Sequence, residues 1–210
     1  MAEVAALYNS LPTLGEADEQ FVNRHVMLHA LSSLLAQYEY AFGLCLVHAH
    51  CKFAEGEIML ATGNVTQPEM TENTPTYYPE RWLSTGEPYE FTVRRTEKPP
   101  TELIDEFHRI VKDSKLQGIL GLYHIEGDKA VPAVIEWTKG RKNLTREITD
   151  HDKTGEPVQT AWDFGRGDAV TMSCTIYCDQ RTTRRSSKQK NTRSHIKSRD
   201  ECNADDWKFG

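Results

Sequence analysis

Long apolar runs are missing from this 210-residue sequence, since no segment approaches the roughly 20 apolar residues that span a bilayer. The N-terminal stretch has no basic cluster ahead of an apolar core, so it does not have the form of a secretion signal. A Gly-rich phosphate loop followed by Lys-Ser/Thr and a Gly-x-Ser-x-Gly motif are also missing. These absences disfavour nucleotide hydrolysis and serine hydrolase chemistry. They favour an intracellular protein, cytoplasmic or nuclear, without a membrane partner.

Cysteine is scarce, with five residues in the whole chain, at positions 45, 51, 174, 178 and 202. An odd number in mostly apolar contexts favours reduced thiols that pack as small apolar side chains. On regular strands Cys45 and Cys51 lie about 20 Å apart, and Cys174 and Cys178 about 13 Å apart, so neither pair shares one metal ion.

Charge is distributed unevenly along the chain. Eight Lys or Arg and no acidic residue lie between positions 181 and 199, which leaves 17 basic against 31 acidic residues elsewhere, a net charge of −14. An acidic body repels phosphate backbones, so any nucleic acid contact is expected from residues 181–199 alone. Residues 181–210 lack a hydrophobic period and are predicted to be a disordered basic tail, resembling a nuclear-import signal near Arg184 and Arg185.

Two helices and several strands are predicted from hydrophobic periodicity. An apolar stripe at helical spacing predicts a first helix from Asp18 to Gly43, and a second helix is expected over 101–115. Strands are expected at 44–51, 57–65, 119–125, 131–137, 143–148 and 169–178. Because hairpins dominate, we predict an α+β fold, a mainly antiparallel sheet of about five to six strands with two helices packed on one face. The expected domain spans 18–180, after an N-terminal extension over 1–17.

The segment 68–100 holds six prolines and five aromatic residues. Long loops in small domains are usually functional or disordered, and aromatic residues argue against disorder. We therefore expect this segment to wrap over the domain as a possible lid, with one short strand near Tyr89 to Arg94.

His48 and His50 are the most suggestive residues for function. They are alternate residues in the apolar run 44–51, which we expect to form a buried hairpin with 57–65, so both imidazoles point to one face. Buried imidazoles need hydrogen-bond partners. Three interpretations stay open for this pair: a metal site, a metal-free acid-base or substrate-binding pocket, and a purely structural role.

Candidate partners for these histidines come from nearby segments. His25 and His29 lie four residues apart on the first helix, and Glu55 and Glu57 flank the expected turn. A zinc or other divalent metal site is predicted from His48, His50 and His29, and a catalytic site from the two strand histidines with Glu57.

Ligand-binding residues are expected from two further places. Trp82 and Tyr89 lie in the possible lid, and Arg141 and Arg146 lie in the expected hairpin that also carries Glu136. Two arginines on one hairpin can clamp a carboxylate or phosphate, although alternating charges also suit a solvated face.

Several longer stretches carry a family resemblance. The segments LVHAHC (46–51), EGEIMLATGN (55–64) and PERWLSTGEPYEFT (79–92), with EWTKGRKN (136–143) and AWDFGRGD (161–168), are similar to a group of uncharacterised proteins from filamentous fungi. The resemblance covers residues 21–178 and implies no known activity.

Two functions of different class follow from the sequence. The first is a small soluble enzyme or ligand-binding protein, with His48 and His50 at the floor of a pocket between the first helix and the sheet. The second is a non-catalytic interaction protein with an acidic body and a tail that directs it to the nucleus.

Overall fold

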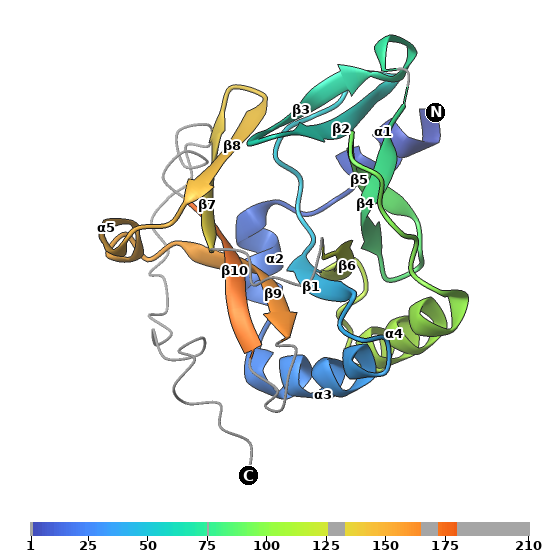
Figure 1. Cartoon of the computed structure of the whole chain (residues 1–210), viewed down its shortest axis with the longest axis vertical. Coiled ribbons are helices and arrows are strands. Elements are labelled where there is room, and N and C mark those ends of the chain that lie inside the picture. The colour runs from blue at the N-terminus through green and yellow to red at the C-terminus, as the bar shows by residue number, and fades with distance from the viewer. Residues whose placement is uncertain (1, 75, 126–132, 165–171, 180–210) are drawn as a thin grey trace.

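The protein forms a β-barrel, seen in a computed structural model that describes residues 2–74, 76–125, 133–164 and 172–179. Within these residues ten strands form a closed ring in the order β1-β6-β4-β5-β2-β3-β8-β7-β10-β9, and β9 pairs back onto β1 (Figure 1). The strands are β1 Phe42–Leu46, β2 Glu57–Thr62, β3 Val65–Met70, β4 Tyr78–Leu83, β5 Pro88–Thr92, β6 Leu120–His124, β7 Val134–Lys139, β8 Lys142–Glu147, β9 Val158–Phe164 and β10 Met172–Cys178.

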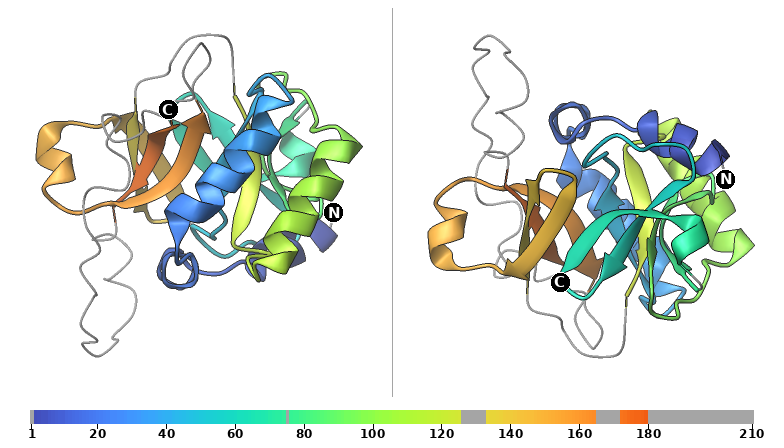
Figure 2. Two further views of the ribbon diagram at one scale, coloured as in Figure 1. Left: turned by 90° about the horizontal axis from the view of Figure 1, so that it is seen from below. Right: turned by 90° about the horizontal axis from the view of Figure 1, so that it is seen from above.

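Five helices in the described part of the chain surround the ring at different places. They are α1 Ala2–Asn9, α2 Leu14–Gln20, α3 Arg24–Ala36, α4 Thr101–Asp113 and α5 Asp150–Lys153, with a short 3₁₀ turn at Thr71–Asn73. Helices α3 and α4 lie side by side against the barrel wall (Figures 1 and 2). The buried face of α4 is formed by Leu103, Phe107 and Val111, whose four-residue spacing places them on one stripe.

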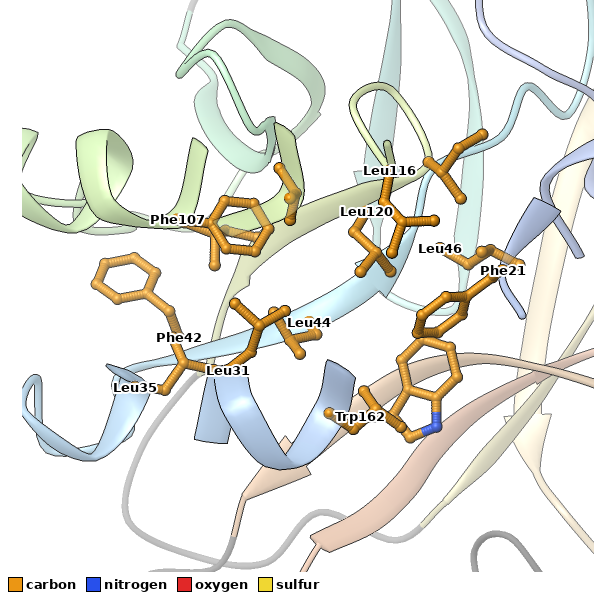
Figure 3. Close-up of a cluster of buried hydrophobic side chains, with 14 of the residues drawn as sticks. Phe21, Leu31, Leu35, Phe42, Leu44, Leu46, Phe107, Leu116, Leu120 and Trp162 are labelled. Atoms are coloured by element: carbon orange, nitrogen blue, oxygen red, sulfur yellow. The ribbon is translucent and has the colours of Figure 1, made fainter. Parts of the chain in front are cut away.

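Two apolar layers lie on opposite faces of β1. Leu44 and Leu46 point outward and join the core beneath the helices, whereas Cys45 and Val47 join the cluster inside the barrel. Alternate side chains of a strand point to opposite faces, so one short run supplies both layers. Figure 3 shows the outer layer, where side chains of α3 and α4 meet those of β1 and β6.

The chain repeats one order of elements. Helix α3 is followed by β1 to β5, and α4 is followed by β6 to β10. In both halves the second and fifth strands pair in parallel, β2 with β5 and β7 with β10. The β2–β3 and β7–β8 hairpins both turn at a glycine with positive φ, Gly63 at 62° and Gly140 at 66°. The ring order stays the same when β1 to β5 are exchanged for β6 to β10, strand by strand. The fold therefore has a pseudo-twofold axis.

Particular residue pairs are also related by the pseudo-twofold axis. Leu44 of β1 lies opposite Trp162 of β9, and Leu122 of β6 lies opposite Trp82 of β4. Leu44 and Leu122 also lie opposite each other, on the pseudo-axis. All four side chains are buried in the outer core. The two halves therefore share a packing unit as well as a connectivity.

Gly43 and Gly121, each directly before one of these leucines, allow the strands to approach closely. A Cβ atom on Gly43 would lie 2.9 Å from the carbonyl oxygen of Trp162 and would also overlap the ring of Tyr123. A Cβ atom on Gly121 would lie 2.6 Å from the carbonyl oxygen of Trp82. Glycine is thus needed at the equivalent position of both halves.

The predicted fold class is wrong in its sheet. A closed mixed barrel replaces the open, mainly antiparallel sheet of five to six strands with two helices on one face. Two of the barrel strands, β4 and β5, lie in the segment 68–100 that was expected to be a loop, and the strand expected near Tyr89 is β5. Pro79 and Pro88 lie at strand ends, where a missing N–H is tolerated, so proline did not exclude strands here.

The predicted hairpin of 44–51 with 57–65 is also wrong. β1 pairs with β6 and β9, and β2 pairs with β3 and β5. β1 and β2 therefore do not pair although they are adjacent in sequence, because residues 47–56 form a long irregular connection instead of a tight turn.

The single first helix predicted from Asp18 to Gly43 is divided. Helix α2 begins at a capping box in which the Thr13 N–H donates to Glu16 Oε2 over 2.8 Å. Asn23 adopts a left-handed conformation with φ of 55° between α2 and α3. Helix α3 ends at Ala36, and Gly43 lies inside β1 instead of ending the helix.

Other predicted elements are confirmed. Helix α4 and strand β6 match their expected positions, and β7 and β8 form the expected hairpin. Residues 169–171 of the last predicted strand and the whole basic tail lie outside the described residues, so the tail's role and a nuclear location stay predictions. No helix of the described residues is long and apolar enough to cross a membrane.

Candidate functional site

The two histidines lie where β1 ends. After Leu46 the chain leaves the ladder, and His48 and His50 follow on an irregular segment at one end of the barrel. Their ring centroids are 4.6 Å apart, with an interplanar angle of 70°. His48 is 3% exposed, and the side chain of His50 is 5% exposed. The prediction that the rings are buried side by side is thus confirmed, although not on a regular strand.

The N-terminal segment holds the histidine segment in place. The N–H of His50 donates to the Tyr8 hydroxyl over 3.2 Å, and the N–H of Ala49 donates to the Pro12 carbonyl over 2.9 Å. Asn9 both accepts from the Phe53 N–H over 2.8 Å and donates to the Phe53 carbonyl over 3.0 Å. The expected N-terminal extension is therefore part of the wall around the site.

Three charged side chains meet inside the barrel beside the histidines. Arg81 of β4 lies opposite Glu90 of β5, and its Nε is 3.1 Å from Glu90 Oε2. Its Nη2 is 3.7 Å from Oε1 of Glu136 on β7. These residues are only 8%, 4% and 4% exposed. Arg81 and Glu90 belong to the first half of the chain and Glu136 to the second, so the ion cluster joins the two halves.

His48, Glu136 and Cys178 form the part of the cluster nearest to the end of the barrel. Nδ1 of His48 is 2.8 Å from the carbonyl oxygen of Leu46. Because a carbonyl only accepts, Nδ1 carries the proton and Nε2 is an acceptor. Nε2 lies 3.8 Å from Cys178 Sγ, and that thiol donates to Glu136 Oε2 over 3.3 Å.

Burial keeps both imidazoles neutral. Burial, together with the neighbouring His50, lowers the pKa of His48 to about 4, against the effects of the Leu46 carbonyl and Glu136. Burial also lowers the pKa of His50 below its ordinary value. At neutral pH the two rings therefore supply hydrogen-bonding groups without positive charge.

The two carboxylates differ in their pKa. Burial raises the pKa of Glu90 despite the adjacent Arg81 guanidinium. Burial also acts to raise the pKa of Glu136, but the Arg81 guanidinium and the hydrogen bond from the Cys178 thiol outweigh it and leave that pKa below its ordinary value. The Cys178 thiol has a pKa well above its ordinary value because of burial and Glu136, so it stays protonated. Glu136 is thus the charged acceptor of the site.

A small pocket opens beside these groups. Its cavity volume is about 20 Å³, and its wall combines the histidine segment with β7, the start of β8 and the end of β10. The lining residues are Leu14, His48, Ala49, His50, Glu136, Trp137, Thr138, Asn143, Cys178 and Asp179. The pocket lies at the barrel end and not between the first long helix and the sheet, where apolar side chains fill the space.

Glu57 and the two predicted arginines form ion pairs of their own. Arg141 binds both carboxylate oxygens of Glu57, with Nη1 3.0 Å from Oε1, and donates to the Lys52 carbonyl over 2.7 Å. Arg146 binds Asp152 through two contacts of 2.6 Å. None of these side chains lines the described pocket. The structure does not bring Glu57 together with His48, nor the two arginines together as one clamp.

The two predicted lid aromatics are core residues. Trp82 and Tyr89 are each 1% exposed. Trp82 packs edge-on against Phe42 in the outer core, and the Tyr89 hydroxyl is 3.3 Å from Cys45 Sγ inside the barrel. Neither lines the pocket.

The predicted metal ligands are divided between two environments. His29 is exposed on α3, whereas His48 and His50 are buried at the end of the barrel. Among the described residues no group of three or more His, Cys, Asp or Glu side chains is arranged to hold a metal ion.

Arg81, Glu90 and Cys178 were missed as site residues by the sequence analysis, and Glu136 was placed in a different site. A signal for the charged members was present in the sequence. Arg81 precedes Trp82, Glu90 lies between Tyr89 and Phe91, and Glu136 lies between Ile135 and Trp137. Large apolar residues on both sides of a charged residue indicate a strand that is covered on both of its faces. The charged side chain of such a strand is then expected to be buried as well.

Comparisons with known protein families, curated proteins and solved structures found no match. The resemblance to fungal proteins therefore stays a prediction, and the function must be argued from the site itself.

Proposed function

We propose that this protein binds a small molecule in the pocket at the end of the barrel, and that His48 and Glu136 accept hydrogen bonds from it. The proposal rests mainly on one observation, a buried cluster of ionisable groups that opens onto a pocket. Buried groups with shifted pKa values that line a pocket are typical of ligand-binding and catalytic sites.

The energetics of burial support this proposal. Removing a charge from water costs several kcal/mol, and apolar side chains of similar volume often give a more stable core than a buried ion pair. Arg81, Glu90 and Glu136 occupy interior positions that apolar residues fill elsewhere in the same barrel, such as Met59 and Ala161. A ligand site accounts for charge at these positions, and stability alone does not.

The geometry assigns each group a role. His48 presents an unprotonated Nε2 that accepts a hydrogen bond, and the charged Glu136 accepts hydrogen bonds beside it. Arg81 keeps Glu136 charged and is itself fixed by Glu90. Cys178 acts as a hydrogen-bond donor and not as a nucleophile, because its thiol stays protonated.

Ligand-observed NMR with a library of small fluorinated fragments tests the proposal. Wild type is expected to bind a subset of fragments that the double variant His48→Leu/His50→Leu no longer binds. The matched control is His108→Leu, which removes a half-buried imidazole on α4 that contacts Ser84 and lies outside the pocket. Circular dichroism establishes that the variants are folded.

A second readout uses the wild type alone. Fragments that bind are expected to shift the backbone amide signals of 47–50 and 136–143. Fragment binding that persists in the double variant, or shifts confined to other segments, would contradict the proposal.

A further inference from the structure

The lining of the pocket is rich in hydrogen-bond acceptors and carries no positive charge. Glu136 is charged, and the lining also includes Asp179. No Lys or Arg side chain is among the described residues that line the pocket. The neutral imidazoles of His48 and His50 do not offset the charge of Glu136.

Hydrogen bonds within the described site leave acceptors without full partners. The single thiol proton of Cys178 faces both Glu136 Oε2 and His48 Nε2, and it is donated to the carboxylate, the closer of the two. The other carboxylate oxygen, Oε1, lies 3.7 Å from Arg81 Nη2, which is too long for a hydrogen bond. Glu136 is 96% buried, so it has little access to solvent.

The balance of charge in the ion cluster also favours a hydrogen-bond donor with positive charge in the pocket. The buried ion cluster has one guanidinium, Arg81, for two carboxyl groups, Glu90 and Glu136. Arg81 approaches Glu90 at 3.1 Å and Glu136 only at 3.7 Å. Arg81 therefore makes the longer contact with the carboxylate that faces the pocket, and a cation in the pocket would give that carboxylate a second counter-charge.

Size restricts the chemistry of such a cation. The cavity of about 20 Å³ exceeds the roughly 10 to 15 Å³ that one water molecule requires, so a group of the size of water fits it. A primary ammonium group has one heavy atom and three N–H donors. Guanidinium and trimethylammonium groups have at least four heavy atoms and fit such a small cavity less well.

We propose that the pocket takes the protonated primary amine of a small ligand, with Glu136 and His48 Nε2 as its acceptors. This inference rests on the proposed function and adds the chemical class of the ligand. The remainder of the ligand extends from the pocket towards Trp137 and Thr138, which are the half-buried residues of β7 in the lining.

NMR titration of the histidine ring signals with matched small probes tests the inference. The probes are methylammonium, methanol, acetate and tetramethylammonium, each added to the full-length protein at constant ionic strength. Methylammonium is expected to shift the ring signals of His48 at concentrations at least about 10-fold lower than any other probe, since it alone combines charge, donors and size.

Two variants locate the effect. Glu136→Gln is expected to weaken the methylammonium response at least about 10-fold, because it removes the charge and keeps the shape. Asp152→Asn is the matched control, a 6% exposed carboxylate bound by Arg146 outside the pocket, and it is expected to leave the response unchanged.

The possible outcomes separate the two proposals. A response to methanol or acetate that equals or exceeds the response to methylammonium would overturn the amine inference and leave the small-molecule site in place. Histidine signals that respond to none of the four probes would overturn both. An equal methylammonium response in wild type and Glu136→Gln would overturn the assignment of Glu136.

Discussion

Single residues decide where charge is buried in this barrel. Arg81 is the one guanidinium that the described ion cluster contains, and it contacts a carboxylate from each half of the chain. His48 contributes an imidazole whose neutrality depends on burial. Both residues lie where a change in protonation or charge alters folding stability as well as ligand binding.

Arg81→Met is expected to destabilise the protein by about 3 to 5 kcal/mol, because Glu90 and Glu136 lose their counter-charge inside the barrel. Their folded-state pKa values then rise above the unfolded values. A carboxyl group of this kind stabilises the fold at low pH and loses that effect as pH rises, so the deficit is expected to be smaller at pH 5 than at pH 7.5. Urea unfolding at both pH values measures it.

The double variant Arg81→Met/Glu90→Gln provides the control for this prediction. Removing one of the two unpaired carboxylates is expected to restore part of the lost stability. An equal deficit at both pH values, together with no restoration, would contradict the described ion cluster.

His48 is expected to make the protein less stable in acid. Its pKa falls from an ordinary value near 6.5 to about 4 on folding, so the unfolded chain binds a proton first as pH decreases. This contribution is complete above about pH 6.5 and is lost as pH falls towards 4, and the loss by pH 4 amounts to about 3 kcal/mol. The free energies of unfolding of wild type and His48→Gln are therefore expected to converge by that amount between pH 7.5 and pH 4. Parallel pH profiles would show that His48 is not buried as described.

The limits of sequence reasoning are clear at the residue scale. Two alternate histidines in an apolar run were sufficient to predict a buried pair, because the period of a strand and the cost of burial are local properties. The partners Arg81, Glu90 and Cys178 come from strands whose ring order depends on long-range pairing. No local pattern near His48 contains that information.

At the scale of elements, close approach between strands determines the shape of the barrel. β1 and β6 pair along five residues on the pseudo-axis, with Gly43 and Gly121 allowing contact with β9 and β4. Periodicity predicted α4 and the β7–β8 hairpin, because an apolar stripe and a Lys139-Gly140 turn are complete within one segment. The division of the first helix depended on Asn23, whose left-handed conformation has no strong sequence signal.

Gly121→Ala is expected to destabilise the protein by about 1 to 3 kcal/mol, because the added methyl group would lie 2.6 Å from the backbone carbonyl of Trp82. The matched control is Gly15→Ala, a helical position with open space around the new Cβ atom. That change is expected to be neutral or to stabilise by up to about 1 kcal/mol. Thermal unfolding followed by circular dichroism compares them. Equal midpoints for the two variants would contradict the close approach.

At the scale of the whole molecule, the barrel consists of two halves with the same order of elements. They meet along three strand contacts, β1 with β9, β4 with β6, and β3 with β8, and across the β1–β6 pair. The contact of β3 with β8 has two residue pairs, Val65 with Leu144 and Thr66 with Asn143. The sequence did not predict the repeat, since the equivalent residues of the two halves are isolated single positions. The number of residues between one such position and the next also differs between the two halves.

Hydrogen exchange is expected to be uneven around the ring. The β3–β8 contact is short and β3 is half-buried along its length, so its amides are expected to exchange at least about 100-fold faster than those of β1 and β6. The β1–β6 pair lies beneath α3 and α4 and is therefore expected to open only with the whole fold. Exchange by mass spectrometry or NMR measures both regions. Equal protection at the two places would contradict a barrel whose halves separate first at β3 and β8.

The central claim is that groups from both halves create one acceptor-rich ligand site at the end of the barrel. A crystal structure from crystals soaked in methylammonium chloride tests it most directly. The predicted result is a methylammonium ion whose nitrogen lies about 3 Å from both a Glu136 carboxylate oxygen and His48 Nε2. A pocket closed by its own side chains, or one in which methylammonium contacts neither residue, would contradict the claim.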